Sequence, residues 1–441
     1  MKPSRSDENR GSTTPGARAL AVEVLRRVER DDAFLAAALH GELRSWPTLS
    51  PRDASLATAL AFGTLRTARF LDAALGRHAR RGVESFPPKV RWHLRVAAYQ
   101  LAFLSRVPAS AAVNEAVRAA KRVGGEPVAR AVNAILRRVA TDLADARPSL
   151  ADAVWTSLPE AFRARVPRSA CEGFASGDDA PWTGLRVRAD LDRETVARDV
   201  QDERPDASVE LGSTSPRAVL VRRAGSVDTL ACIGDGRAVI QDEGSQLVGL
   251  AVGAMPGDRI LDACAGRGHK TTLLAEAARP HGQVDAADLH EHKLRIAVRD
   301  ATALGLTLGT VAAVDWTAGL GPFEPATYDR VLVDAPCTGS GTFLRRPEIA
   351  LRFSEAKLAE LSALQVAIAS RCAALVRPGG ILVVATCSIF PQEGEALADA
   401  IRSTLGLEPW ALARFGTPRA TLPVELHGTD GYALSAFRRP A

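Results

Sequence analysis

The chain has 441 residues, of which 46% are hydrophobic and 24% are charged, a composition typical of globular proteins built from more than one domain. No run approaches the roughly 20 apolar residues that span a bilayer, and residues 1–16 lack the apolar core of a signal peptide. We therefore expect a cytoplasmic protein with a disordered tail over residues 1–16. Its six cysteines form no CxxC pair, so neither a metal site nor a disulfide framework is predicted.

The net charge of +5 is distributed unevenly along the chain. Residues 17–140 contain 21 Lys and Arg against 10 Asp and Glu, a net charge of +11, whereas the chain beyond residue 140 carries −7. A basic third on an otherwise acidic protein indicates contact with a polyanion, although most charged helix faces simply meet solvent.

Residues 17–140 are expected to form a helical domain. Apolar side chains recur at intervals of three and four over residues 113–120 and 132–139, which leaves the arginines for other faces. A central helix should begin after Pro87 and Pro88. Its inward positions would be Val90, Leu94, Ala97, Leu101 and Leu104.

Residues 141–238 give a weaker pattern. Strands are expected near residues 185–189 and 218–224, with a helix over 191–201 between them. We interpret this region as a linker and a small α+β module, and the residue types in it indicate no chemistry.

From residue 239 to the end, short apolar runs alternate with helical segments. This pattern predicts a parallel, doubly wound sheet, whose ligands bind outside the carboxyl ends of the strands. A final strand over residues 431–439 should close it as part of an antiparallel pair. The expected parallel strands lie within residues 258–265, 282–289, 307–315, 328–336 and 379–388.

The first of these strands ends at Asp262 and continues into CAGRGHKTT, with Gly266 and Gly268 just before an expected helix. Such a turn lets the backbone approach a ligand at a helix N-terminus, but alone it fits either a nucleotide site or a plain tight turn. A P-loop is disfavoured because His269, not glycine, precedes Lys270. The sequence GxGxxG is not matched either.

A carboxylate stands at the end of each of the next three strands: Asp288, Asp315 and Asp334. An acid after the second strand of a nucleotide-binding fold can accept hydrogen bonds from ribose hydroxyls. Any one of the three could cap a helix instead, but all three at successive strand ends favour a ligand site.

Two cysteine motifs carry a family resemblance: DAPCTGSGTFLRRPEI, which begins at Asp334, and ATCSIFPQEGE, which begins at Ala385. They resemble the paired motifs of the RNA cytosine-5 methyltransferases (the NOL/NOP/Sun family). The likeness extends through IQDEGSQL and DGYALSAF, and residues 17–140 resemble a NusB-like RNA-binding domain. The resemblance implies a class I, Rossmann-like methyltransferase domain over residues 239–441.

The cofactor that the resemblance implies is S-adenosyl-L-methionine. Asp288 would bind its ribose, Asp315 its adenine side, and Asp334 would lie near both cofactor and target base. The family loop usually reads CAAPGGK, so Arg267 and His269 depart from it. The residues of the implied cofactor loop are Cys264, Ala265, Gly266, Arg267, Gly268, His269 and Lys270.

The resemblance also implies catalytic roles. Cys387 would add to carbon 6 of the cytosine, Asp334 would hydrogen-bond the base, and Cys337 would assist release of the product. Buried structural thiols remain the alternative for both cysteines, and the sequence does not show what would favour a thiolate at Cys387. Arg345 and Arg346 would contact phosphates or simply face solvent.

The function expected from this resemblance is methylation of carbon 5 of a cytosine in small-subunit (16S) ribosomal RNA, by a monomer that binds no membrane. The RNA would be naked or partly assembled, with an unpaired or flipped target base. Two alternatives stay open: methylation of transfer RNA or another ribosomal position, and an RNA-binding assembly factor whose cofactor loop has decayed.

Overall fold

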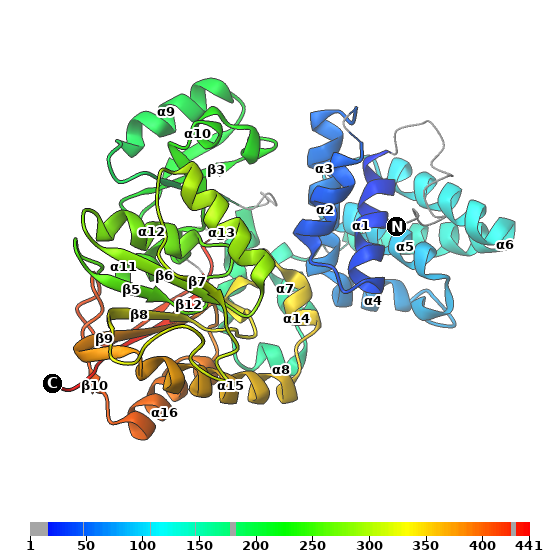
Figure 1. Cartoon of the computed structure of the whole chain (residues 1–441). Helices are drawn as coiled ribbons and strands as arrows, with labels where there is room; N and C mark the ends of the chain where they lie inside the picture. Colours follow the sequence, from blue (N-terminus) through cyan, green and yellow to red (C-terminus); the bar gives the residue numbers. More distant parts are fainter. Residues whose placement is uncertain (1–15, 47, 106, 146, 177–181, 425–428) are drawn as a thin grey trace, which may run out of the picture. The chain divides into compact units, whose positions relative to one another are not determined.

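The computed structural model describes residues 16–46, 48–105, 107–145, 147–176, 182–424 and 429–441. The tail expected over residues 1–16 therefore lies outside the described residues, except for Gly16. The chain divides into two compact units, one ending at Ser157 but including residues 174–179, the other comprising residues 158–173 and 180–441. Each is described by itself (Figure 1).

The first unit is all helical, as predicted. Its central helix carries Val90, Leu94, Ala97 and Leu101 into the core, each no more than 8% exposed. Leu104 follows the helix end and is only half-buried. The α-helices are α1 (Ala17–Arg30), α2 (Leu35–Arg44), α3 (Pro51–Arg66), α4 (Ala68–Gly76), α5 (Pro88–Phe103), α6 (Ala109–Asp145) and α7 (Leu150–Ser157).

Helix α6 is interrupted at Gly125, where φ is 72° and ψ is −169°, a conformation that glycine adopts without a steric penalty. Pro127 follows and cannot donate a backbone hydrogen bond, so the segment is two helices joined at a kink. Both halves bury their apolar faces and leave basic side chains exposed: Arg118, Lys121, Arg122, Arg137 and Arg138.

The second unit begins with α8 (Glu160–Arg163) and a four-stranded antiparallel sheet in the order β2-β3-β1-β4. The sequence predicted β1, β3 and α9 but missed the edge strands β2 and β4. Arg186 on β1 is fully buried and donates to Thr272 Oγ1 at 2.8 Å, which anchors this sheet to α12 of the same unit. The elements are β1 (Thr183–Val187), α9 (Arg193–Glu203), β2 (Ser208–Leu211), β3 (Ala218–Arg222), α10 (Ala231–Gly234) and β4 (Ala238–Ile240).

The large sheet has the predicted doubly wound form. Its strand order is β10-β12-β9-β8-β5-β6-β7, with β11 paired to β12. Strands β5 to β9 are joined in parallel, and β12 runs antiparallel to β9, as expected for the last strand. The strands are β5 (Arg259–Asp262), β6 (Gln283–Asp288), β7 (Val311–Ala313), β8 (Tyr328–Asp334), β9 (Val376–Thr386), β10 (Glu408–Pro409), β11 (Arg419–Leu422) and β12 (Tyr432–Arg438).

Helices cover both faces of this sheet (Figure 1). Side chains alternate along a strand, so Val331 and Val333 of β8 join one core cluster while Leu332 joins the other. One cluster includes α15 (Glu355–Ala373) and α16 (Glu395–Leu405). The opposite one includes α11 (Glu243–Ala251), α12 (His269–Ala278) and α13 (Glu291–Ala303).

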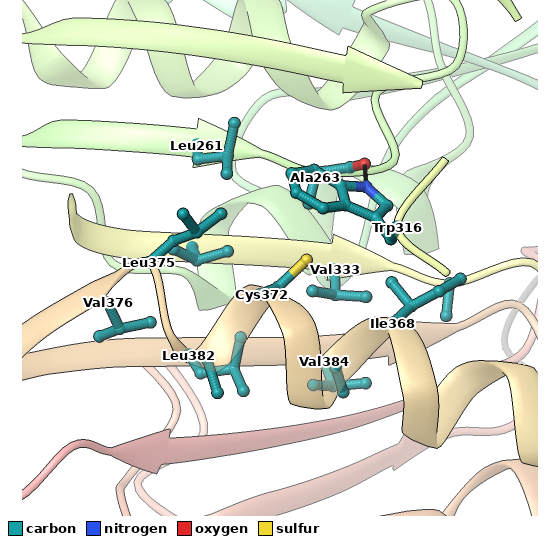
Figure 2. Close-up of a cluster of buried hydrophobic side chains, with 14 of the residues drawn as sticks. Leu261, Ala263, Trp316, Val333, Ile368, Cys372, Leu375, Val376, Leu382 and Val384 are labelled. Atoms are coloured by element: carbon teal, nitrogen blue, oxygen red, sulfur yellow. Dashed lines mark hydrogen bonds between the residues drawn. The ribbon is translucent and has the colours of Figure 1, made fainter. Parts of the chain in front are cut away.

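The core reaches the carboxyl edge of the sheet through Trp316. Its indole Nε1 donates to the carbonyl oxygen of Ala263 at 2.7 Å, and its ring packs in the same cluster as Val333 and Cys372 (Figure 2). This contact ties the segment after β7 to the segment after β5. Packed side chains of the core therefore hold in place the edge of the sheet at which ligands bind in such folds.

Candidate active site

The loop between β5 and α12 forms the first wall of the site. The Ala265 amide donates to the Ala287 carbonyl oxygen at 2.8 Å, and the Gly266 amide donates to Asp288 Oδ2 at 3.0 Å. Gly268 (φ 83°) directly precedes α12 and packs against α13. A Cβ added to it would lie 2.6 Å from the Cβ of Ala297 on α13. A Cβ on Gly266 (φ 56°) would meet no atom within 4 Å. The loop is thus packed on one side and open on the other.

Asp288 ends β6 and is 9% exposed. Besides the Gly266 amide, its carboxylate accepts from the His290 amide at 2.8 Å and lies 3.5 Å from the Lys293 ammonium. The next residue, Leu289, is 61% exposed although it is apolar. Leu289 was not among the predicted site residues. The sequence feature that could have indicated it is an apolar residue directly after a carboxylate that ends a strand.

Asp262 was noted only as the end of the first strand, yet its environment is unusual. Its side chain is fully buried and accepts from Thr271 Oγ1 at 2.7 Å, while Oδ1 has no hydrogen-bond partner. Burial raises the pKa of this carboxyl to about 7. An unsatisfied buried carboxyl oxygen beside a glycine loop is well suited to a cationic ligand.

Four other predicted cofactor-site residues lie in environments that differ from one another. Arg267 and His269, the departures from the family loop, have exposed side chains. Cys264 packs against the core, and burial raises the pKa of its thiol well above the ordinary value, which makes it unreactive. Asp315 is exposed beyond β7, where it accepts from the Thr317 hydroxyl at 2.6 Å, a bond that lowers the pKa of its carboxyl.

Lys270, in the first turn of α12, and Asp334, the last residue of β8, form an ion pair at the carboxyl ends of the parallel strands. The Lys270 ammonium lies 2.6 Å from Asp334 Oδ2 and 5.5 Å from the centroid of the Tyr432 ring. Burial lowers the pKa of Lys270, but attraction and hydrogen bonding to Asp334 outweigh it, so the pKa is raised. The ammonium therefore stays charged at neutral pH.

The two predicted catalytic cysteines are brought together. Strands β8 and β9 pair in parallel with Asp334 opposite Ala385, so the segments that follow them begin side by side. The Sγ atoms of Cys337 and Cys387 are 3.2 Å apart. Hydrogen bonding to Cys387, reinforced by burial, raises the pKa of Cys337 well above its ordinary value. In this contact either sulfur can be the donor.

Lys270 also interacts electrostatically with Cys387. After the contributions of Asp334 and Asp262, attraction to the Cys387 sulfur is a further cause that raises the pKa of Lys270.

Arg345 has neither of the two environments expected for it. Its guanidinium pairs with both Asp242 and Asp430, and it also approaches the Trp182 carbonyl oxygen at 3.5 Å. It thereby joins the segment before α11 to the segment before β12. A guanidinium held by two carboxylates is committed to the fold rather than to a phosphate; Arg346 is exposed.

Among the residues that the structure describes, no group of three or more His, Cys, Asp and Glu side chains could hold a metal ion. In the same part of the chain, no helix combines the length and apolar character that membrane crossing requires.

Known proteins resemble this chain over most of its length. The family model for 16S rRNA methyltransferase RsmB/F matches residues 250–413, and the NusB family model matches residues 15–141. A putative methyltransferase of Mycobacterium tuberculosis is 34% identical over the full length of both chains. The ribosomal RNA small subunit methyltransferase B of Thermus thermophilus is 33% identical, covering 87% of this chain and 86% of its own.

The likeness extends to a solved structure. The crystal structure of PH0851 matches 97% of this chain and all of its own, with a TM-score of 0.77 at 21% identity, which shows a common fold. The chain therefore belongs to the 16S rRNA methyltransferase RsmB/F family, as an S-adenosylmethionine-dependent methyltransferase with a NusB domain at its N-terminus.

Proposed function

We propose that the enzyme methylates carbon 5 of a cytosine in small-subunit (16S) ribosomal RNA through a transient bond between Cys387 and the base. The observation that carries the proposal is the pair of thiols, with Sγ atoms 3.2 Å apart, beside the Lys270–Asp334 ion pair. Two thiols in contact suit a reaction in which one sulfur attacks and the other holds a proton.

The residues at the carboxyl ends of the parallel strands suit the cofactor. When bound, S-adenosylmethionine supplies an electrophilic methyl group on a positively charged sulfonium. The open side of the loop at Gly266 gives room for a ligand, and Asp262 has an unpaired oxygen beside that loop. We assign the ribose hydroxyls to Asp288, an apolar contact with the adenine to Leu289, and the adenine side of the site to Asp315.

Cys387 acts first in the proposed mechanism. Carbon 5 of cytosine is a poor nucleophile, so the Cys387 thiolate adds to carbon 6 and the ring electrons move toward carbon 5 and the ring nitrogen. The Asp334 carboxylate accepts a hydrogen bond from the exocyclic amine, while the Lys270 ammonium beside Asp334 offsets the negative charge that develops on the ring. Carbon 5 is then nucleophilic enough to accept the methyl group.

Cys337 acts in the release of product. The proton on carbon 5 must leave and the bond between Cys387 Sγ and carbon 6 must break. The Cys337 thiol donates its proton to the departing sulfur, and the proton from carbon 5 then restores the Cys337 thiol. Both cysteines end protonated, and Cys387 loses a proton before the next cycle. The raised pKa of Cys337 suits a group that holds a proton until this step.

Substitution of the two cysteines tests the proposal. Cys387→Ala should abolish methyl transfer, because it removes the sulfur that adds to carbon 6 in the proposed mechanism. Cys337→Ala should instead trap a protein–RNA adduct that survives denaturing electrophoresis. The matched control is Cys232→Ala, which alters a buried thiol of α10 in the core beside the small antiparallel sheet and should behave like the unmodified enzyme.

The target RNA is identified in cells by bisulfite sequencing of total RNA. A strain that carries only the Cys387→Ala enzyme should lose one methylated cytosine in small-subunit ribosomal RNA. Loss of a methyl group from transfer RNA instead would reassign the substrate. An active Cys387→Ala enzyme, together with an inactive Cys337→Ala enzyme that forms no adduct, would reverse the catalytic roles.

The alternative of an assembly factor with a decayed cofactor loop depended on Arg267 and His269. Both side chains are exposed, and Lys270 keeps its acidic partner Asp334. The loop therefore offers that alternative no support, and calorimetric titration with S-adenosylmethionine would settle it directly.

A further inference from the structure

We propose that Glu393 is a positioning residue that fixes Cys337 and Cys387 relative to each other and keeps the proton on Cys337 during the reaction. The inference rests on the proposed function and extends it to a residue that touches neither sulfur through a hydrogen bond. Glu393 ends the short turn η5 (Pro391–Glu393), and its side chain is fully buried.

The carboxyl group of Glu393 holds the segment that contains Cys337. It accepts from the Thr338 amide at 2.8 Å, from the Thr338 hydroxyl, and from Gln365 Nε2 at 3.0 Å. Gln365 in turn donates to the Pro336 carbonyl oxygen at 2.9 Å. The residues on both sides of Cys337 are therefore tied, directly or through Gln365, to one carboxyl group.

The main chain of Glu393 holds the segment that contains Cys387. Its carbonyl oxygen accepts from the hydroxyl of Thr386, the residue directly before Cys387, at 2.8 Å. Thr338 directly follows Cys337, so one residue contacts a sequence neighbour of each thiol. A shift of Glu393 would change the distance between the two sulfurs.

A second set of contacts joins the same two segments without any charge. The hydroxyls of Ser340 and Ser388 are 2.8 Å apart, and the Gly341 amide donates to the Cys387 carbonyl oxygen at 3.0 Å. The rings of Phe343 and Phe390, which follow these segments, both pack on Phe162 of α8. These contacts should keep the fold intact when Glu393 is altered, so its electrostatic effect can be measured separately.

The charge of Glu393 distinguishes the two sulfurs. Its carboxylate is one of the groups that disfavour a thiolate at Cys337, after the hydrogen bond to Cys387 and burial. Because Glu393 is buried and bonded to the residue that follows Cys337, its charge acts on that thiol with little screening by water and favours its protonated form.

The test is Glu393→Gln, which keeps the shape of the side chain and removes its charge, with Glu395→Gln as control because Glu395 is exposed two residues further on. We expect Glu393→Gln to lower kcat by about tenfold or more, with little change in the KM for RNA, and to accumulate the covalent adduct. Its pH–rate profile should shift, because Cys337 would lose its proton more readily. Glu395→Gln should change none of these quantities.

Variants at Thr338 provide a second, independent test of the role of Glu393. Thr338→Val removes a hydroxyl that donates to Glu393 and should accumulate adduct, whereas Thr338→Ser keeps that hydroxyl and should restore release. This arm decides the matter if Glu393→Gln does not fold.

Cys337→Ala serves as the reference for adduct formation. If it traps an adduct while a folded Glu393→Gln enzyme releases product at the unmodified rate with an unchanged pH profile, the inference about Glu393 is wrong and the proposed function stands. If Cys337→Ala itself traps nothing, the catalytic roles proposed for the two cysteines fail.

Discussion

The carboxyl of Asp262 shows how burial at the end of a strand controls charge. Its pKa is raised from 3.8 to about 7, chiefly because the ionised form has lost its water. Between about pH 4 and 7 the native protein holds a proton that the unfolded chain has released. Stability should therefore be greatest at the acidic end of that window and fall as the pH rises through it, by up to about 1.4 kcal/mol per pH unit from this group.

Thermal unfolding of the unmodified protein and of Asp262→Asn, followed between pH 5 and 8, measures this contribution. The difference in stability between the two proteins should move in favour of Asp262→Asn as the pH rises and level off above about pH 7. A constant difference across the range would show that the carboxyl titrates normally. Because a cation favours the ionised form, S-adenosylmethionine should stabilise the unmodified protein more at pH 8 than at pH 6.

The motifs predicted Cys337, Cys387 and Asp334 as site residues, and the parallel strands explain why the segments that carry them meet. The partners of the site residues could not be predicted in the same way. The partner of Lys270 lies 64 residues away and is selected by strand order. The same applies to Glu393, whose hydrogen-bond donors come from three separate segments.

The loop between β5 and α12 is the element that we propose holds the cofactor. Both of its glycines have positive φ, but the space around them differs. We expect Gly268→Ala to destabilise the enzyme markedly, because the new Cβ would overlap the backbone and side chain of Ala297 and force α12 and α13 apart. Gly266→Ala should cost only the backbone strain of roughly 1 kcal/mol.

Cofactor binding should separate these two variants further. A methyl group on Gly266 points into the open side of the loop, so Gly266→Ala should weaken binding of S-adenosylmethionine while the protein stays folded. Calorimetric titration and thermal unfolding of both variants provide the comparison. Equal loss of stability in the two proteins would mean that the loop is not packed against α13 as described.

At the level of elements, the prediction succeeded where burial was greatest. Apolar runs in β5, β6, β8 and β9 are buried on both faces, which gives a strong signal. Strand β2 is partly exposed along its length and β4 has three residues, so neither produces a clear pattern. The interruption of α6 depends on one glycine conformation, and a helical period continues on both sides of it.

At the scale of the whole molecule, charge separates the two functions of the chain. The catalytic edge is rich in carboxylates suited to a cationic cofactor, whereas the helical unit carries the excess of Lys and Arg. Affinity for RNA should therefore depend mainly on phosphate contacts from the helical unit and fall steeply with salt. Cofactor affinity should respond far less to ionic strength, since two of the carboxylates assigned to the cofactor, Asp262 and Asp288, are buried.

Reversing two exposed charges on α6 tests this division. The double change Arg137→Glu and Arg138→Glu should weaken RNA binding by about tenfold or more at moderate salt and reduce its salt dependence, because phosphate contacts are lost and repulsion is added. Affinity for S-adenosylmethionine should not change. Arg402→Glu, exposed on α16, is the matched control for a reversed charge elsewhere. If the control weakens RNA binding equally, the docking surface lies outside the helical unit. The reason is that the position of a reversed charge affects binding only where that charge contacts a phosphate.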